Sequence, residues 1–416
     1  MNPNRLLERF LRYVRVDTTA RPGASEYPSS PGQLELGKLL VEELRRAGIA
    51  DARQDPHGIV TASIPPSVDR EVPVVAFCAH LDTSPETPGA GVLPRVVENY
   101  QGGELVLPGH PGRVIRPEEH PDLTHMIGKT IITSDGSTLL GADDKAGVAV
   151  IVETAAWLAE HPEVPHGRIR TCFTCDEEIG RGVDHIDVAE LGAAACYTLD
   201  GQGADTIDVE TFSADLAMVS ILGVNIHPGI AKNRMVNALR VAADFLARLP
   251  RREGSPETTD GRQGFLHPYE IRGGVAEAKL HILLRDFDTA MLQSWADRLR
   301  QAAAGSMGEF PGSKVEVAVT PQYRNMAEGL AREPRAVPFA VEALERLGRT
   351  PRLTIVRGGT DGSRLTEMGL PTPNLAVGQH APHSPLEWAS LEEMDLAARW
   401  LIELVEVWAQ PADSPP

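Results

Sequence analysis

Histidine and acidic side chains follow several apolar segments of this sequence. They stand at the ends of PVVAFCAHLD (73–82), RIRTCFTCDEE (168–178) and AAACYTLDG (193–201). Imidazoles and carboxylates bind divalent metal ions and also act as general acids and bases. If folding brings these side chains together, the residue types indicate metal-assisted or acid–base chemistry.

The first of these segments ends in HLD. His80 and Asp82 are two residues apart, so they point to the same side of an extended chain. A metal-bound imidazole usually donates its second N–H group to a carboxylate, and Asp82 is placed to orient His80 in this way. Taken alone, the pattern is equally typical of a capped strand end.

Two further acidic clusters are more informative. Asp143 and Asp144 are adjacent in GADDKAG, just before an apolar helix. One aspartate would cap that helix, but a second beside it is repelled unless a cation is near. DEEIG (176–180) places three carboxylates, Glu177 and Glu178 among them, after a segment that we expect to be buried, which favours a functional cluster over a solvated turn. Asp200 in YTLDG, by itself, is typical of an Asp-Gly turn.

Other polar residues carry weaker signals. His227, His380 and His383 are isolated histidines, which are usually structural. Arg357 in RGGTDGS lies beside a glycine-rich turn that lacks the phosphate-loop pattern, and an arginine there suits a carboxylate. The lone CxxC pair at 172–175 is interpreted as buried cysteines.

Taken together, two histidines and several carboxylates match the mixed ligation of a dinuclear hydrolytic zinc site. The sequence contains no GxSxG motif, which would have indicated a competing serine nucleophile.

The elements that must position these residues alternate between strand and helix patterns. This rhythm predicts an α/β fold with a mostly parallel sheet flanked by helices, in which the carboxyl ends of the strands form one crevice. A stretch whose pattern runs strand, helix, strand, strand, helix, strand predicts an inserted, smaller α+β domain. We expect a catalytic domain from 1–208 and 326–416, with the insertion at 209–325.

Composition excludes several classes of protein. The 416 residues carry a formal charge of −18, which argues against nucleic acid as a partner. No apolar run reaches the roughly 18 residues of a membrane span, and the N-terminal segment is typical of an amphipathic helix, not a signal peptide. Four cysteines fit a cytoplasmic location.

Seven segments, in order, resemble the peptidase T family, the tripeptide aminopeptidase branch of the dizinc aminoacylase, carboxypeptidase and dipeptidase superfamily. The resemblance runs from about residue 5 to 408 and rests on HLDTSP (80–85), SDGSTLLGADDKAG (134–147), CDEEIGRG (175–182), YTLDG (197–201), HPGIAKNRMVNA (227–238), SPETTDGRQGF (255–265) and RGGTDGSRL (357–365). It implies hydrolysis of the first peptide bond of short peptides, tripeptides above all, by a homodimeric enzyme with two Zn²⁺ per subunit.

The resemblance also implies roles for single residues. His80 and Asp200 would hold one zinc, Glu178 and His383 the other, and Asp143 would bridge them. Asp82 would orient His80, and Glu177 would be the general base. His227 resembles a histidine of the inserted lid or dimerisation domain that stabilises the tetrahedral intermediate. Arg357 is a candidate clamp for a substrate carboxylate.

One segment departs from the family pattern. Many peptidase T sequences read like FHGKHEF around the last ligand, whereas this chain reads APHSPLEW at 381–388. His383 is preferred over His380 because Glu387 and Trp388 follow it at the family's spacing. Three alternatives remain: an N-acyl amino acid deacylase, a dipeptidase, or an inactive metal-binding scaffold.

Overall fold

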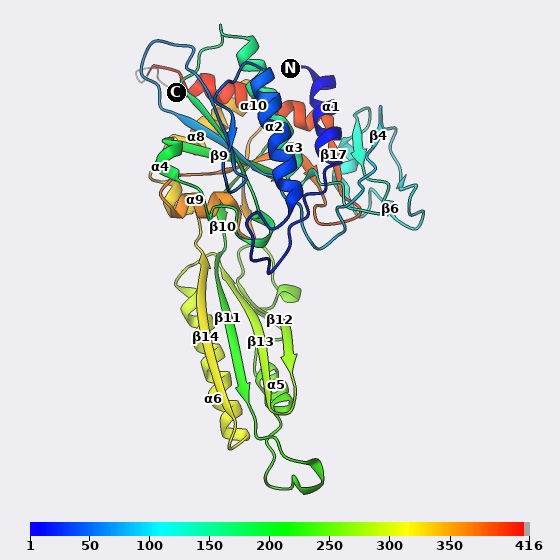
Figure 1. The fold of residues 1–416 in the computed structure, drawn as a ribbon, viewed down its shortest axis with the longest axis vertical. Coiled ribbons are helices and arrows are strands. Elements are labelled where there is room, and N and C mark those ends of the chain that lie inside the picture. The colour runs from blue at the N-terminus through cyan, green and yellow to red at the C-terminus, as the bar shows by residue number, and fades with distance from the viewer. Residues whose placement is uncertain (412–416) are drawn as a thin grey trace. The chain divides into compact units, whose positions relative to one another are not determined.

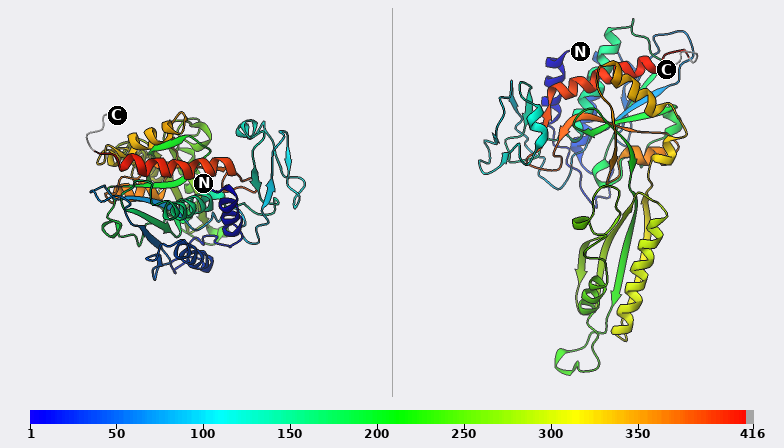
Figure 2. Two further views of the ribbon diagram at one scale, coloured as in Figure 1. Left: turned by 90° about the horizontal axis from the view of Figure 1, so that it is seen from above. Right: turned by 180° about the vertical axis from the view of Figure 1, so that it is seen from behind.

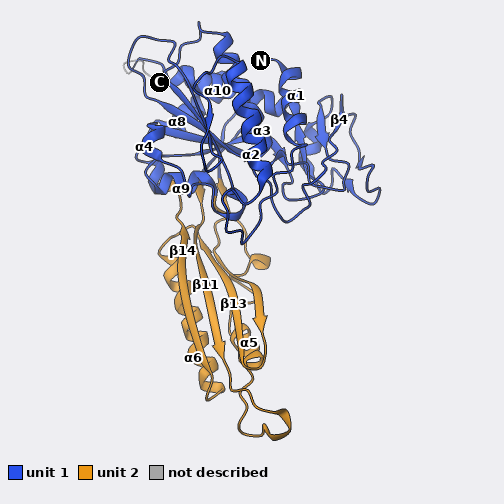
Figure 3. Cartoon of the chain, in the orientation of Figure 1, with its two compact units in different colours: residues 1–209, 328–354, 360–416 blue, residues 210–327, 355–359 orange. Residues whose placement is uncertain are grey.

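A computed structural model of the chain describes residues 1–411 and divides into two compact units (Figure 3). The first comprises Met1–Val209, Glu328–Thr354 and Thr360–Pro416, of which the last five residues lie outside the described part. The second comprises Glu210–Ala327 and Ile355–Gly359. The segment 355–359, which contains Arg357, therefore belongs to the second unit, whereas the sequence pattern places the end of the insertion at 325.

The described part of the first unit is organised around an eleven-stranded sheet (Figure 1). Its main path runs β1-β2-β8-β3-β9-β16-β17-β7-β4, and β10 pairs with β16 and β15. The strands are β1 (Arg53–Gln54), β2 (Val60–Ile64), β3 (Val75–His80), β4 (Arg95–Val97), β7 (Ile131–Thr133), β8 (Ile169–Thr174), β9 (Ala195–Gln202), β10 (Thr206–Thr211), β15 (Arg352–Val356), β16 (Asn374–His380) and β17 (Trp388–Ser390).

The predicted α/β class is confirmed. The four central strands β8, β3, β9 and β16 are parallel to their neighbours in this group, and antiparallel strands extend the sheet on both sides. Because parallel strands end at the same edge, the residues that follow β3, β8 and β9 lie close together.

Helices cover both faces of this sheet (Figure 2). The helices of the unit are α1 (Pro3–Tyr13), α2 (Pro31–Arg46), α3 (Ala142–Glu160), α4 (Val188–Leu191), α8 (Ala336–Arg346), α9 (Asp361–Glu367) and α10 (Leu391–Trp408), with α7 (Ala327–Leu330) at its boundary and the 3-10 turns η1 (Pro121–His125) and η2 (Glu177–Ile179). Phe77 of β3 belongs to the larger core, which includes α3 and α10, whereas Cys78 packs on the other face with Leu191 and Leu365. Alternate residues of one strand thus bind the two helical layers to the sheet.

The stretch 84–130 carries little regular structure. β5 (Leu105–Val106) and β6 (Val114–Ile115) form a separate two-stranded antiparallel sheet. A small core that includes Tyr100, Leu123 and Trp388 holds this stretch against β17.

The second unit has the predicted order strand, helix, strand, strand, helix, strand. Its elements are β11 (Ser213–Leu222), α5 (Ala238–Ala247), β12 (Phe265–Gly273), β13 (Glu277–Asp286), α6 (Met291–Glu309) and β14 (Lys314–Tyr323), with the 3-10 turns η3 (Pro228–Ile230) and η4 (Pro256–Thr258). The strands form one antiparallel sheet in the order β12-β13-β11-β14, and α5 and α6 pack on it around Phe245 and Leu299.

All four cysteines are free and buried, as the interpretation of the CxxC pair expected. Among residues 1–411, no helix is both long and apolar enough to cross a membrane.

Candidate metal centre

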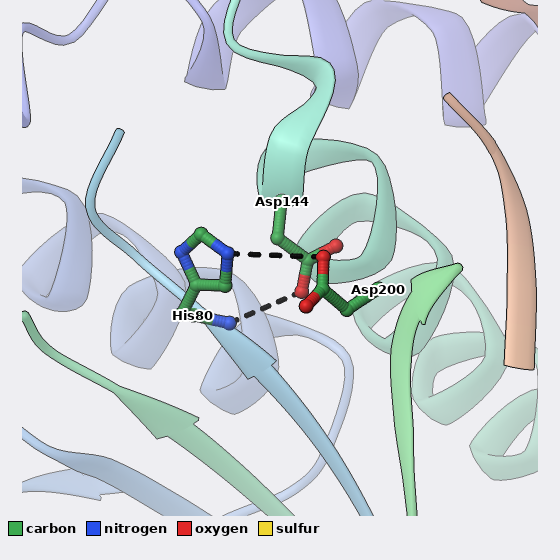
Figure 4. A group of neighbouring side chains, drawn as sticks. All are labelled: His80, Asp144 and Asp200. Carbon is green, nitrogen blue, oxygen red and sulfur yellow. Dashed lines mark hydrogen bonds and ion pairs between the residues drawn. The ribbon is translucent and has the colours of Figure 1, made fainter. Parts of the chain in front are cut away.

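Three elements of the first unit supply the centre of the candidate site. His80 is the last residue of β3, Asp200 lies near the end of β9, and Asp143 and Asp144 stand at the start of α3. Figure 4 shows His80, Asp144 and Asp200 converging from these three elements. The convergence follows from the parallel central strands, because α3 begins beside the edge at which β3 and β9 end.

The imidazole of His80 is buried and surrounded by carboxylates. Its Nε2 lies 3.0 Å from Oδ1 of Asp143 and 3.9 Å from Oδ1 of Asp200. Its Nδ1 lies 3.1 Å from the backbone oxygen and 3.4 Å from Oδ1 of Asp82. One ring nitrogen therefore faces the cluster, while the other faces Asp82.

Asp143 lies between two imidazoles. Its Oδ1 is near His80, and its Oδ2 lies 3.3 Å from Nε2 of His383. The same nitrogen of His383 lies 2.9 Å from Oε2 of Glu178. Although His80 and His383 are about 300 positions apart in the sequence, both contact one carboxylate.

Asp82 holds the two glutamates through their backbones. Its Oδ1 accepts the N–H group of Glu177 at 3.0 Å, and its Oδ2 accepts that of Glu178 at 3.1 Å. The fully buried carboxylate of Asp82 thus contacts the segment after β8 as well as His80.

The crowding of these acids shifts their ionisation. Burial, reinforced by the charge of Asp143, raises the pKa of Glu178 to about 7. Burial raises the pKa of Glu177 and of Asp200 well above the usual carboxyl range. Burial opposes the charged form of His383, but hydrogen bonds from its ring to Asp143 and Glu178 outweigh it and raise its pKa to about 11. Carboxylates packed together in this way favour a bound cation.

The residues fit divalent metal ions. Two sets of ligand atoms each lie within 4.8 Å of one another, one from His80, Asp144 and Asp200 and one from His80, Asp143 and Glu178. Oε1 of Glu178 is buried without a hydrogen-bond partner, so it has a lone pair to offer. Imidazole nitrogen and carboxylate oxygen are the donors that zinc accepts.

A family model described as peptidase family M20/M25/M40 matches residues 135–407. This chain belongs to that family. Peptidase T of Geobacillus kaustophilus (strain HTA426) is 42% identical over 407 residues, covering 98% of this chain and 99% of the relative. Peptidase T of Shouchella clausii (strain KSM-K16) is 44% identical over 410 residues, covering 98% and 99%. The predicted resemblance is therefore confirmed.

Solved structures of the family share the fold. Aminopeptidase PepT from Bacillus cereus ATCC 10987 has a TM-score of 0.76 at 26% identity and covers 99% of this chain and 100% of its own. A dinuclear metal binding peptidase from family M20 of Bacillus subtilis has a TM-score of 0.65 at 17% identity, covering 97% and 98%. As a member of the M20 family the chain is a metal-dependent peptidase, which confirms the predicted enzyme class.

Several polar residues of this M20 site were not predicted. Asp144 is fully buried; its Oδ2 accepts the backbone N–H group of His80 at 3.1 Å, and burial raises its pKa well above the usual range. The peptide bond between Asp143 and Asp144 is cis. The adjacent pair was visible in the sequence, and in the structure it is Asp143 that contacts His383.

Two amide side chains of β16 surround Asp200. Nε2 of Gln379 donates to Oδ1 of Asp200 at 3.1 Å and to its backbone oxygen at 2.9 Å. Oδ1 of Asn374 accepts the backbone N–H group of Asp200 at 3.1 Å. No sequence signal identifies them, because they lie within an apolar strand and reach Asp200 only through the pairing of β16 with β9.

Glu387 was noted in the sequence only for its spacing from His383. Its carboxylate is buried and accepts the backbone N–H groups of Leu140 and Gly141, each at 2.7 Å, and of Asp143 at 3.0 Å. Burial raises the pKa of Glu387 to about 7, against the effect of these hydrogen bonds.

His380 belongs to a different cluster. Its ring stacks on Trp388 with a centroid distance of 3.7 Å, its Nε2 lies 2.7 Å from Glu393, and its Nδ1 lies 3.4 Å from Asp122. Of the two histidines in GQHAPHSP, only His383 contacts Asp143 and Glu178 in the described structure.

His227 and Arg357 belong to the second unit. His227 is exposed, and its Nδ1 accepts the backbone N–H group of Gly229 at 3.1 Å. The guanidinium of Arg357 donates to the backbone oxygens of 259, 261 and 263 and lies over the rings of Phe212 and Phe265. Their predicted roles toward a substrate stay predictions.

Proposed function

We propose that this M20 peptidase is a dizinc aminopeptidase that releases the N-terminal residue of short peptides, tripeptides above all. The observation that carries this proposal is the contact of Asp143 with both His80 and His383. The names of the relatives, peptidase T and aminopeptidase PepT, support the substrate class.

In this proposal His80 and Asp200 hold one ion, and Glu178 and His383 hold the other. Asp143 is shared, since its two oxygens face different imidazoles. Three ligand carboxylates against two divalent ions leave a net positive centre.

Bound zinc supplies an acidified water and a Lewis acid for the peptide carbonyl. Glu177 is proposed as the general base. Its carboxylate takes the proton of the attacking water and delivers it to the leaving amine, so that it returns to its starting state. A raised pKa suits this role, because a base must be able to hold the proton between the two transfers.

The remaining predicted features belong to the same proposal. His227 would stabilise the oxyanion, and Arg357 would bind a substrate carboxylate. The enzyme would be a cytoplasmic homodimer. Light scattering of the purified chain tests the dimer directly.

A panel of peptides tests the proposed function. The purified protein is assayed on di-, tri- and tetrapeptides with free and acetylated N-termini, before and after removal of metal by a chelator and after return of Zn²⁺. We expect chelator-sensitive release of the first residue from free-amine tripeptides. Faster cleavage of the acetylated forms would favour the deacylase alternative, preference for dipeptides would favour a dipeptidase, and metal binding without hydrolysis would favour a scaffold.

A further inference from the structure

Glu387 joins two parts of the site that are far apart in the sequence. It ends the turn between β16 and β17, which also carries His383, and it is 1% exposed. The three N–H groups that it accepts belong to residues 140–143, about 245 positions earlier. One carboxylate therefore connects the turn of His383 to the segment of Asp143.

The N–H groups of that segment are paired from outside it. The N-terminal N–H groups of a helix have no partner inside the helix. Gly141 occupies the N-cap position of α3 with φ +82° and supplies no side-chain cap. Asp143 and Asp144 have non-helical backbone angles, and Asp144 caps the regular part of α3 by accepting the N–H group of Gly147 at 3.2 Å. Glu387 pairs the N–H groups that precede it, with Oε2 on Leu140 and Gly141 and Oε1 on Asp143.

The turn of His383 is held by long-range contacts as well. His383 has φ +60°, which is uncommon for a residue other than glycine. Thr87 donates its hydroxyl to the backbone oxygen of His383 at 2.7 Å. With Glu387 at the end of the turn, His383 is fixed relative to both the segment after β3 and the start of α3.

We infer that Glu387 is a positioning residue that sets Asp143 against His383 and so determines how tightly the site holds its second ion. The inference rests on the proposed dinuclear site. Glu387 contacts the backbone of Asp143 and leaves the carboxylate of Asp143 free for metal. Removal of a side chain that orients a metal ligand typically weakens metal binding about 10-fold to 100-fold.

Glu387→Gln is the decisive variant. A glutamine has one accepting oxygen, so its NH₂ group must face at least one of the three N–H groups. The shape of the side chain is retained, but at least one of its hydrogen bonds to the backbone N–H groups of residues 140–143 is lost. We expect Zn²⁺ to bind the second site about 10-fold to 100-fold more weakly.

Glu393→Gln is the matched control. Glu393 is also a buried carboxylate of the C-terminal segment, but it contacts His380 and not residues 140–143. Loss of a buried carboxylate in general would affect both variants alike, whereas positioning of Asp143 affects only the first.

The experiment is a Zn²⁺ titration against a competing chromophoric chelator for the unaltered protein and both variants, with circular dichroism to verify folding. Two ions on the unaltered protein, and a second ion at least 10-fold weaker in Glu387→Gln than in Glu393→Gln, support the inference. Equal affinities in the two variants overturn it and leave the proposed function standing. An unaltered protein that binds no pair of ions overturns both.

Should Glu387→Gln fail to fold, Glu387→Asp gives the second measurement. It keeps the carboxylate but shortens its reach by one methylene. A second ion at least threefold weaker than in the unaltered protein supports the inference, and an unchanged affinity overturns it.

Discussion

The carboxylate of Asp82 accepts the backbone N–H group of Glu177 at 3.0 Å. It accepts that of Glu178 at 3.1 Å and lies 3.4 Å from Nδ1 of His80. The orientation of one proposed ligand and the backbone of the proposed base therefore depend on the same side chain.

Asp82→Asn should disturb both the orientation of His80 and the backbone of Glu177. The NH₂ group of asparagine would face one of the two N–H groups, which costs about 1–3 kcal/mol of stability for an unpaired buried group. We expect Zn²⁺ affinity to fall about 10-fold to 100-fold. Asp55→Asn is the control, because Asp55 also accepts two backbone N–H groups, those of His57 and Ile59, away from the site. Equal loss of Zn²⁺ affinity in both variants would contradict the role of Asp82.

Glu177→Gln tests the proposed base. The amide cannot take a proton, so kcat should fall about 10²-fold to 10⁴-fold, while the metal content stays at two ions. Metal analysis and tripeptide kinetics measure the two quantities on the same sample. Asp184→Asn changes an exposed carboxylate farther along the same loop and should keep full activity. Turnover of metal-loaded Glu177→Gln at the rate of the unaltered enzyme would exclude Glu177 from this role.

The candidate-site residues that could be proposed from the sequence lie at or just beyond the ends of apolar strands. His80, Glu178 and Asp200 are of this kind, because strand ends can be recognised from hydrophobic runs and parallel strands share one edge. Gln379 and Glu387 act through contacts that only the folded chain creates. The residues next to Gln379 and Glu387 in the sequence do not indicate that these side chains contact Asp200 and residues 140–143.

The same distinction holds for the fold. The long apolar strands and helices were found from their periodicity, including the strand and helix order of the second unit. The antiparallel extension through β17, β7 and β4 was not predicted, because each strand has only three residues and shows no resolvable alternation. The start of α5 at Ala238 follows the capping side chain of Asn237, which accepts the N–H group of Leu239.

Stability should depend on pH through His380. Burial opposes its charged form, but Asp122 and Glu393 outweigh this and raise its pKa above the ordinary value of about 6.5. A raised pKa means that the stabilisation is fully present below about pH 6.5 and is lost as the pH rises through the folded-state value.

Urea denaturation of the unaltered protein and His380→Gln from pH 5 to 9 measures this effect. The difference between their midpoints should be largest at low pH and shrink as the pH rises. His125→Gln removes an exposed histidine near Asp122 and serves as the comparison variant. A difference that grows with pH would have the wrong sign for this cluster.

Gly147→Ala should loosen the contact between α3 and β9. A Cβ atom on Gly147 would lie 2.1 Å from the backbone oxygen of Leu199 and 2.4 Å from Oδ1 of Asp144. Alanine normally stabilises a helix relative to glycine by about 1 kcal/mol, but overpacking here should cost about 1–3 kcal/mol. Gly308→Ala in α6 is the control, because nothing lies within 4 Å of a Cβ atom at Gly308. The stability of this variant should rise. Thermal unfolding of both variants compares the two signs, and a stabilised Gly147→Ala would contradict the close approach.

Gln379→Glu tests how Asp200 is held. Nε2 of Gln379 donates to Oδ1 of Asp200, and a glutamate would replace this donor with a second acceptor against the same oxygen. Because Asp200 is a proposed ligand of the first ion, Zn²⁺ affinity there should change about 10-fold or more. Gln33→Glu is the matched control: Gln33 is also buried and donates to an aspartate, Asp176, at 2.7 Å, but Asp176 is not a proposed ligand. Titration of Zn²⁺ into both variants separates the two cases, since a general effect of a buried charge would lower both affinities and an effect through Asp200 would alter only the first.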